Sequence, residues 1–102
     1  MGKDEAVLET EIQLTRPTQP RITPEQINEQ IVDVKYHRFE GTTLTVCALV
    51  LQNGFTVTGE SACAAPENYN EEIGRKIAYT NAREKIWALE GYALANQLRG
   101  IV

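Results

Sequence analysis

The sequence predicts an α+β protein: a short N-terminal helix, a three-stranded antiparallel β-meander and one long C-terminal helix. Residues 32–39 and 44–61 alternate apolar and polar side chains, as half-buried strands do. Asn53-Gly54 interrupts the second stretch and is the strongest short hairpin signal. Residues 70–98 instead repeat apolar side chains at helical spacing. The chain of 102 residues suffices for one domain with a modest core.

Residues 1–21 are predicted to be a flexible tail, and residues 22–102 the single α+β domain. The tail is acidic near its start and carries Pro17 and Pro20 among polar residues, so it buries too little apolar surface to offset its ordering entropy. The apolar residues between Val7 and Leu14 leave an added edge strand, or docking on a partner, as the alternative.

The short helix is predicted to begin at Thr23, which can cap it, with Pro24 at the first helical position and Gln26 completing a capping box. The first strand follows at Val32. Its alternation places Val32, Val34 and Tyr36 on one face and Asp33, Lys35 and His37 on the other.

A two-residue type I′ turn at Asn53-Gly54 would fix the register of the next two strands, with Gln52 opposite Phe55 and Val50 opposite Val57. One face would then form the core, and the other would be mixed. The predicted core face carries Leu44, Val46, Ala48, Val50, Phe55 and Val57, and the mixed face carries Thr45, Cys47, Leu49, Leu51, Thr56, Thr58 and Glu60.

The two cysteines and the one histidine carry no catalytic or metal-binding pattern. In this register Cys63 would lie on the face opposite Cys47, which disfavours a disulfide and fits a reducing compartment. The sequence has no CxxC, no HExxH and no Gly-rich phosphate loop, and a catalytic triad would have to recruit His37. We therefore expect no enzyme activity, no metal and no cofactor.

The long helix is predicted to begin after Asn70 as its cap and to reach Leu98, with Gly91 as an open question. At roughly 40 Å it would outreach a sheet of about 17–20 Å. Its exposed far end, together with Leu49 and Leu51 on the mixed face, predicts a homo-oligomer. The apolar stripe comprises Ile73, Ile77, Ala78, Ala82, Ile86, Leu89 and Ala93, and the far end comprises Trp87, Tyr92, Leu94 and Leu98.

Net charge and the length of the apolar runs indicate which classes of partner are disfavoured. A net charge of −4 without a basic stripe disfavours duplex nucleic acid, although a local cationic pocket for a small anion stays open. No apolar run approaches the roughly 20 residues that cross a bilayer, and the first residues lack the order of a signal peptide. These features predict a cytoplasmic protein that does not bind membranes.

Several motifs in order resemble a family of small phage and prophage proteins, the gene-product-forty-nine/gene-sixty-six-like family. The resemblance covers about Ile22 to Leu98. It implies a phage accessory protein made in the bacterial host cytoplasm, and no catalytic role accompanies it. The motifs are Gly41-Thr42-Thr43-Leu44-Thr45-Val46-Cys47, Asn53-Gly54-Phe55-Thr56-Val57-Thr58-Gly59-Glu60-Ser61-Ala62-Cys63, Glu72-Ile73-Gly74-Arg75-Lys76-Ile77-Ala78 and Lys85-Ile86-Trp87-Ala88-Leu89-Glu90-Gly91-Tyr92.

The stretch from Gly59 into the long helix is the candidate ligand site, because helix N-termini bind anions and aromatic rings can stack on a base. For each residue the ordinary interpretation is structural: a cap, a solvated partner of Glu71 or Glu72, or packing. Since these two carboxylates oppose a phosphate there, a pocket shared between protomers is the favoured form. The candidate ligand-binding residues are Ser61, Cys63, Asn68, Tyr69, Arg75, Lys76, Tyr79 and Arg83.

Two functions follow from this reasoning. In the first, the protein is a non-catalytic counter-defence oligomer that binds and sequesters a nucleotide immune signal. In the second, it inhibits a host defence protein by presenting its mixed sheet face or its acidic tail. Both rest on analogy with other small phage accessory proteins.

Overall fold

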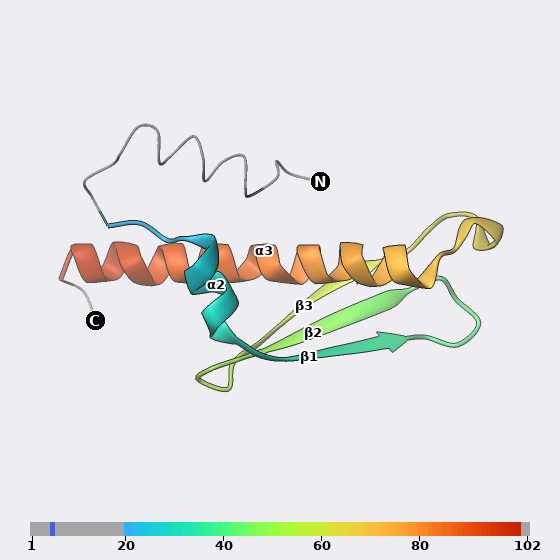
Figure 1. Cartoon of the computed structure of the whole chain (residues 1–102), viewed down its shortest axis with the longest axis horizontal. Helices are drawn as coiled ribbons and strands as arrows, with labels where there is room; N and C mark the ends of the chain where they lie inside the picture. Colours follow the sequence, from blue (N-terminus) through green and yellow to red (C-terminus); the bar gives the residue numbers. More distant parts are fainter. Residues whose placement is uncertain (1–4, 6–19, 101–102) are drawn as a thin grey trace.

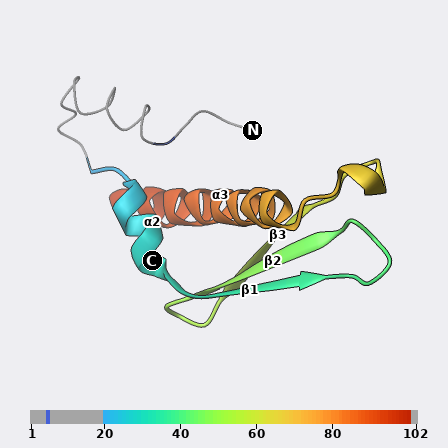
Figure 2. The ribbon, with the colours of Figure 1, turned by 45° about the vertical axis from the view of Figure 1, so that its right-hand side comes forward.

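The computed structural model describes residue 5 and residues 20–100, and it shows the predicted α+β architecture. A three-stranded antiparallel sheet, in the order β1-β2-β3, lies under one long helix (Figures 1 and 2). The predicted tail and the alternative strand lie outside the described residues, except for Glu5, Pro20 and Arg21. The elements are α2 (Pro24–Gln30), β1 (Ile31–Arg38), β2 (Thr45–Leu51), β3 (Thr56–Ser61), the short 3₁₀ turn η1 (Pro66–Asn68) and α3 (Glu71–Leu98).

Helix α2 begins as predicted, with a complete capping box. The Gln26 N–H donates to Thr23 Oγ1 at 3.2 Å, and the Thr23 N–H donates to Gln26 Oε1 at 2.9 Å. Ile27, on the inner face of this helix, is fully buried. The helix therefore closes one end of the core against α3.

The hairpin between β2 and β3 differs from the prediction by one residue of register. The Gly54 N–H donates to the Leu51 carbonyl at 2.9 Å, and the Leu51 N–H donates to the Phe55 carbonyl at 2.8 Å. Gly54 has φ 87°, so the connection is a three-residue loop ending in a left-handed glycine, not a two-residue type I′ turn. Leu49 consequently pairs with Val57, and Val50 pairs with Thr56.

This one-residue shift exchanges the two faces of β2, because side chains alternate along a strand. The face predicted to be mixed is the core face, and Thr45, Cys47, Leu49 and Leu51 are all buried on it. The predicted core face of β2 is only half-buried, and Phe55 is 55% exposed. The prediction that Leu49 and Leu51 are exposed for self-association was therefore wrong.

The core lies between this sheet face and a stripe of small residues on α3. Gly59 of β3 faces the helix so closely that a Cβ atom there would lie 2.2 Å from the Ala82 nitrogen and 2.4 Å from the Ala78 oxygen. Backbone contact at this point brings α3 down onto β2 and β3. The buried hydrophobic residues are Ile27, Cys47, Leu49, Leu51, Val57, Ala78, Ala82 and Ile86.

Helix α3 starts at the predicted cap, where Asn70 Oδ1 accepts from the Ile73 N–H at 3.1 Å, and it continues unbroken through Gly91. Its length is about 42 Å, against about 26 Å for the eight residues of β1, so its C-terminal part extends beyond the sheet (Figure 1). Tyr92 and Leu98 are exposed there, as predicted, but Trp87 is half-buried against the core.

The predicted apolar stripe of α3 was only partly right. Ala78, Ala82 and Ile86 are buried, whereas Ile73 is 54% exposed. Ile77 and Leu89 are exposed as well, because the buried stripe is rotated toward Gly74 and Arg83. Small residues thus line the contact with the sheet, and larger apolar residues flank it.

Both cysteines are free: Cys47 is buried, and Cys63 lies beyond the end of β3. The register from which the absence of a disulfide was predicted was wrong, because Cys47 pairs with Gly59. Within the described part of the chain, no helix is both long and apolar enough to cross a membrane.

Candidate functional site

A hollow of about 440 Å³ lies where β1 ends and the chain approaches α3. Its walls come from the turn between β1 and β2 and from the segment between β3 and η1. The lining residues are Arg38, Gly41, Thr42, Thr43, Cys63, Ala64, Pro66 and Tyr69.

Arg38 and Tyr69 form the charged and aromatic part of this hollow. The Arg38 guanidinium carbon lies 4.3 Å from the centre of the Tyr69 ring, within the range of a cation–π contact. Arg38 Nε donates to the Thr42 carbonyl at 3.1 Å, which fixes the orientation of the guanidinium. Arg38 is exposed, and no carboxylate among the described residues pairs with it.

A second pair of the same kind lies beside the first. Tyr36 and Arg38 are two residues apart on β1 and point to the same face, toward α3. The Arg75 guanidinium of α3 lies 5.3 Å from the centre of the Tyr36 ring and also pairs with Glu71 at 3.2 Å. We call Tyr36, Arg38, Tyr69 and Arg75 together the Arg–Tyr surface.

The Tyr36 phenol of this surface and the Cys47 thiol beneath it stay protonated at neutral pH. Partial burial is the main cause that raises the pKa of Tyr36, with neighbouring Cys47 and Tyr79 contributing. Burial likewise raises the pKa of Cys47. Tyr36 therefore offers a neutral aromatic ring, and Cys47 is an unreactive thiol in the core.

Thr43 and Cys63 hold the two walls of the hollow together. Thr43 Oγ1 donates to the Cys63 carbonyl at 2.8 Å and accepts from the Cys63 N–H at 3.2 Å. The Cys63 thiol donates to the Ala65 carbonyl at 3.2 Å. Tyr69 is anchored in turn, since its hydroxyl lies 3.3 Å from the hydroxyl of buried Thr45.

The structure brings some of the predicted site residues together and separates the others. Cys63 and Tyr69 line the hollow, and Arg75 stands beside it. Asn68 is exposed in η1, and Ser61 is half-buried at the end of β3. The remaining three lie elsewhere on α3: Lys76 is exposed with Glu72 at 3.9 Å, Tyr79 packs against the core, and Arg83 is buried.

Arg38 and Tyr36 were missed by the sequence reasoning. Their spacing contained a signal, because a cation and an aromatic ring two residues apart on a strand share one face. The signal was weak, since the partner residues Tyr69 and Arg75 lie more than thirty positions further along the chain and only the fold brings them near.

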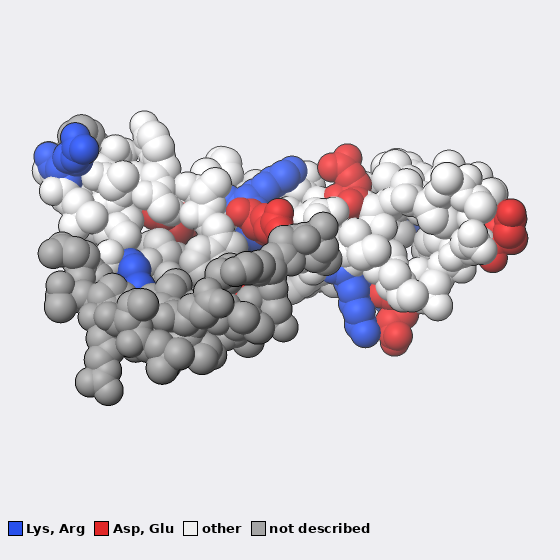
Figure 3. Space-filling model, turned by 90° about the horizontal axis from the view of Figure 1, so that it is seen from above, with Lys and Arg blue, Asp and Glu red and all other residues white. Residues whose placement is uncertain are grey.

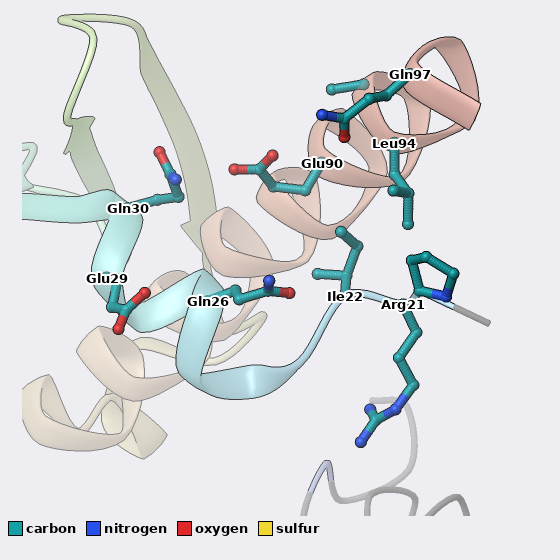
Figure 4. Close-up of a pocket in the computed structure, with 10 residues that line it drawn as sticks. Arg21, Ile22, Gln26, Glu29, Gln30, Glu90, Leu94 and Gln97 are labelled. Atoms are coloured by element: carbon teal, nitrogen blue, oxygen red, sulfur yellow. The ribbon is translucent and has the colours of Figure 1, made fainter. Parts of the chain in front are cut away.

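A second hollow, of about 410 Å³, lies between α2 and the C-terminal half of α3 (Figure 4). Gln26, Glu29 and Gln30 reach it from α2, and Glu90 reaches it from α3. Arg21 extends away from Glu90 in Figure 4. Two carboxylates on its walls make this hollow a poor place for an anion, so the first hollow is the better candidate.

On the face seen in Figure 3, positive and negative residues are scattered among uncharged ones, and the described surface shows no broad basic patch. Among the residues that the structure describes, no three His, Cys, Asp or Glu side chains gather as metal ligands. Of the two hollows described above, the one beside the Arg–Tyr surface therefore combines exposed cations with aromatic rings.

The chain folds as a small two-layer α+β domain, with the Arg–Tyr surface at one end of the sheet and helix. Residues 22–98, about three quarters of the chain, match the model of the Phage protein (N4 Gp49/phage Sf6 gene 66) family. The chain belongs to this family, as its motifs predicted. No curated protein and no solved structure matches it.

Proposed function

We propose that this phage protein is a non-catalytic counter-defence protein that binds and sequesters a nucleotide immune signal in the host cytoplasm. The observation that carries the proposal is the Arg38–Tyr69 pair in a hollow of about 440 Å³. A volume of this size lies in the ordinary range of small-molecule sites.

The Arg–Tyr surface offers both kinds of contact that a nucleotide needs. The outer edges of the Arg38 and Arg75 guanidinium groups can bind phosphate oxygens in forked geometry. The tyrosine rings beside them offer flat surfaces on which a base can stack. Arg75 reaches Tyr36 on β1 while it also pairs with Glu71 at the start of α3, so Arg38 is the cation of this surface that no carboxylate of the described residues neutralises.

The lining of the hollow favours binding over catalysis. It includes no histidine and no carboxylate, which are the usual general acids and bases. Its one thiol, that of Cys63, is engaged with the Ala65 carbonyl. We therefore propose that the ligand is held and not converted.

Self-association is part of the proposal, and two surfaces support it. Tyr92 is 72% exposed and Leu98 58% exposed on the projecting end of α3. Strand β1 is an edge strand of the described sheet. If the β1 strands of two protomers paired antiparallel about Val34, Asp33 of each protomer would lie opposite Lys35 of the other. This pairing requires that Asp33 Oδ1 release the Val34 N–H, which donates to it at 2.8 Å.

A thermal-shift screen followed by calorimetry tests the proposal. The probes are cyclic di-AMP, cyclic di-GMP, cyclic GMP-AMP and cyclic ADP-ribose. We expect at least one to stabilise the wild-type protein and to bind at least tenfold more weakly to Arg38→Ala and Tyr69→Ala. Lys85→Ala, which removes an exposed cation from α3, is the matched control and should bind normally. The absence of stabilisation by every probe would count against sequestration.

Inhibition of a host protein is the alternative function, and the fold limits which surface could contact that protein. The mixed sheet face cannot be presented, because it lies under α3. The opposite face, with half-buried Val46, Ala48 and Val50, is not covered by α3. Recovery of one stoichiometric host protein from bacterial lysate, lost when Val46→Glu or Val50→Glu is introduced, would favour this alternative over the nucleotide.

A further inference from the structure

Arg83 carries a buried positive charge at the junction of α2 and α3. Only 9% of its surface is exposed. Its Nη2 donates to Asn28 Oδ1 at 2.7 Å and to the Pro24 carbonyl at 3.2 Å, and both acceptors are neutral. The carboxylate that neutralises Arg83 within the described structure belongs to Glu5, which Nη1 contacts.

Trp87, one turn further along α3, donates to the same carboxylate oxygen. Its Nε1 lies 2.7 Å from Glu5 Oε2, the atom that also accepts from Arg83 Nη1. A guanidinium and an indole N–H that converge on a single oxygen form a receptor for an oxyanion. We call these two donors the Arg83–Trp87 socket.

The socket and its occupant come from different parts of the chain. Arg83, Trp87 and Asn28 all lie within residues 22–98, which match the family, whereas Glu5 precedes them. The family-matched domain therefore supplies two oriented donors and the positive charge, and the anion that covers them comes from outside it. A buried guanidinium without an anionic partner is costly, so this site favours occupation by some oxyanion.

We propose that the Arg83–Trp87 socket is an anion-binding site for the carboxylate or phosphate oxygen of a small free ligand, and that Glu5 occupies it as an intramolecular competitor. Asn28 and the Pro24 carbonyl hold the guanidinium in place, so the socket persists when Glu5 leaves. The site is separate from the Arg–Tyr surface and does not depend on the function proposed for that surface.

Removing the competitor tests this inference in the full-length chain. Trp87 is the only tryptophan, so its fluorescence reports on the socket directly. We expect Glu5→Ala to lower Tm and to change Trp87 emission, while the control Glu84→Ala, at an exposed position of α3, does neither. Sodium acetate and inorganic phosphate are then titrated separately against sodium chloride of equal ionic strength.

In Glu5→Ala, at least one of the two anions should restore Tm and shift Trp87 emission saturably, with half-saturation at least tenfold lower than in the wild type. Acetate acting alone assigns the socket to carboxylates, and phosphate acting alone assigns it to phosphates. In Glu5→Ala/Trp87→Phe, followed by circular dichroism, restoration should need at least fivefold more anion.

Three results would overturn the inference. The first is that Glu5→Ala retains the Tm and the Trp87 emission of the wild type, since Glu5 then does not occupy the socket. The second is that Glu5→Ala loses stability but neither anion acts differently from chloride, which makes the contact a structural tether alone. The third is that Glu5→Ala/Trp87→Phe is restored at unchanged anion concentration, which makes the effect general and not located at the socket.

Discussion

Replacing Gly59 by alanine tests how the helix is seated on the sheet. The added Cβ would lie 2.2 Å from the Ala82 nitrogen and 2.8 Å from its Cα, and both are backbone atoms that cannot rotate away. Only a shift of β3 relative to α3 relieves the overlap, by about 1.2 Å to reach the 3.4 Å of an ordinary contact. This shift would open a gap between α3 and the sheet and weaken the dispersion contacts of the whole interface, including those of Leu49 and Ile86.

The expected cost follows from this displacement. Overpacking a well-packed core costs about 1–3 kcal/mol, and a clash between two backbones belongs at or above the upper end of that range. The Gly→Ala change also stabilises through the unfolded chain by about 0.4–1 kcal/mol, which offsets only a small part. We therefore expect a net loss of about 2–3 kcal/mol, which lowers Tm by roughly 8–24 °C in a domain of this size.

Urea unfolding followed by circular dichroism measures this loss. The matched control is Gly91→Ala, because a Cβ there meets nothing within 4 Å and the residue is exposed within α3. That variant should be more stable by about 1 kcal/mol, from helix propensity alone. A Gly59→Ala protein within 0.5 kcal/mol of the wild type, on the order of ordinary surface changes, would refute the close-contact argument.

Four further predictions concern the turn, the cap and the thiols. Gly54→Ala should destabilise by about 1–2 kcal/mol in urea unfolding, because φ 87° is unfavourable for a residue with a Cβ. Thr23→Ala should cost about 1 kcal/mol in the same assay, since it removes the side-chain half of the capping box. A thiol reagent at neutral pH should label Cys63 quickly and buried Cys47 only as the protein unfolds; equal rates would contradict the burial of Cys47. Burial raises the pKa of Cys47 in the folded state above the ordinary thiol value of 9.0. The contribution of Cys47 to stability should therefore be constant below pH 9.0 and should fall as the pH rises above that value. In unfolding measured at alkaline pH, Cys47→Ala should reduce this loss of stability.

Local signals in the sequence were sufficient to predict the two α-helices, the three strands and the residues at which the α-helices begin. The capping box at Thr23 and the cap at Asn70 depend on side chains within three residues of the backbone groups that they bind, so both could be predicted without tertiary information. The hairpin at Asn53-Gly54 was located correctly for the same reason. The length of the hairpin loop was predicted wrongly, because Asn-Gly suits both a two-residue turn and a three-residue loop that ends in a left-handed glycine.

That single residue of register decided which face of β2 became the core. Both faces are apolar enough to be buried, so composition could not choose between Leu49 with Leu51 and Val46 with Val50. Contacts between residues far apart in the sequence made the choice. Gly59 of β3 and the small residues Ala78 and Ala82 of α3 let the helix approach the sheet closely only on the face that carries Leu49. Glycine contributes nothing to a hydrophobic periodicity, so the sequence pattern did not reveal that Gly59 fixes the position of α3 on the sheet.

The candidate sites divide in the same way. The sequence by itself determined the phage family, the order of the elements and the region after β3 where Cys63 and Tyr69 lie, because these depend on motifs and on neighbours in the chain. The tertiary structure alone decided that Arg38 of β1 stacks on Tyr69 and that Arg83 is buried against Asn28 and Glu5. These contacts join residues far apart in the sequence, and their geometry exists only once α3 has packed across the sheet.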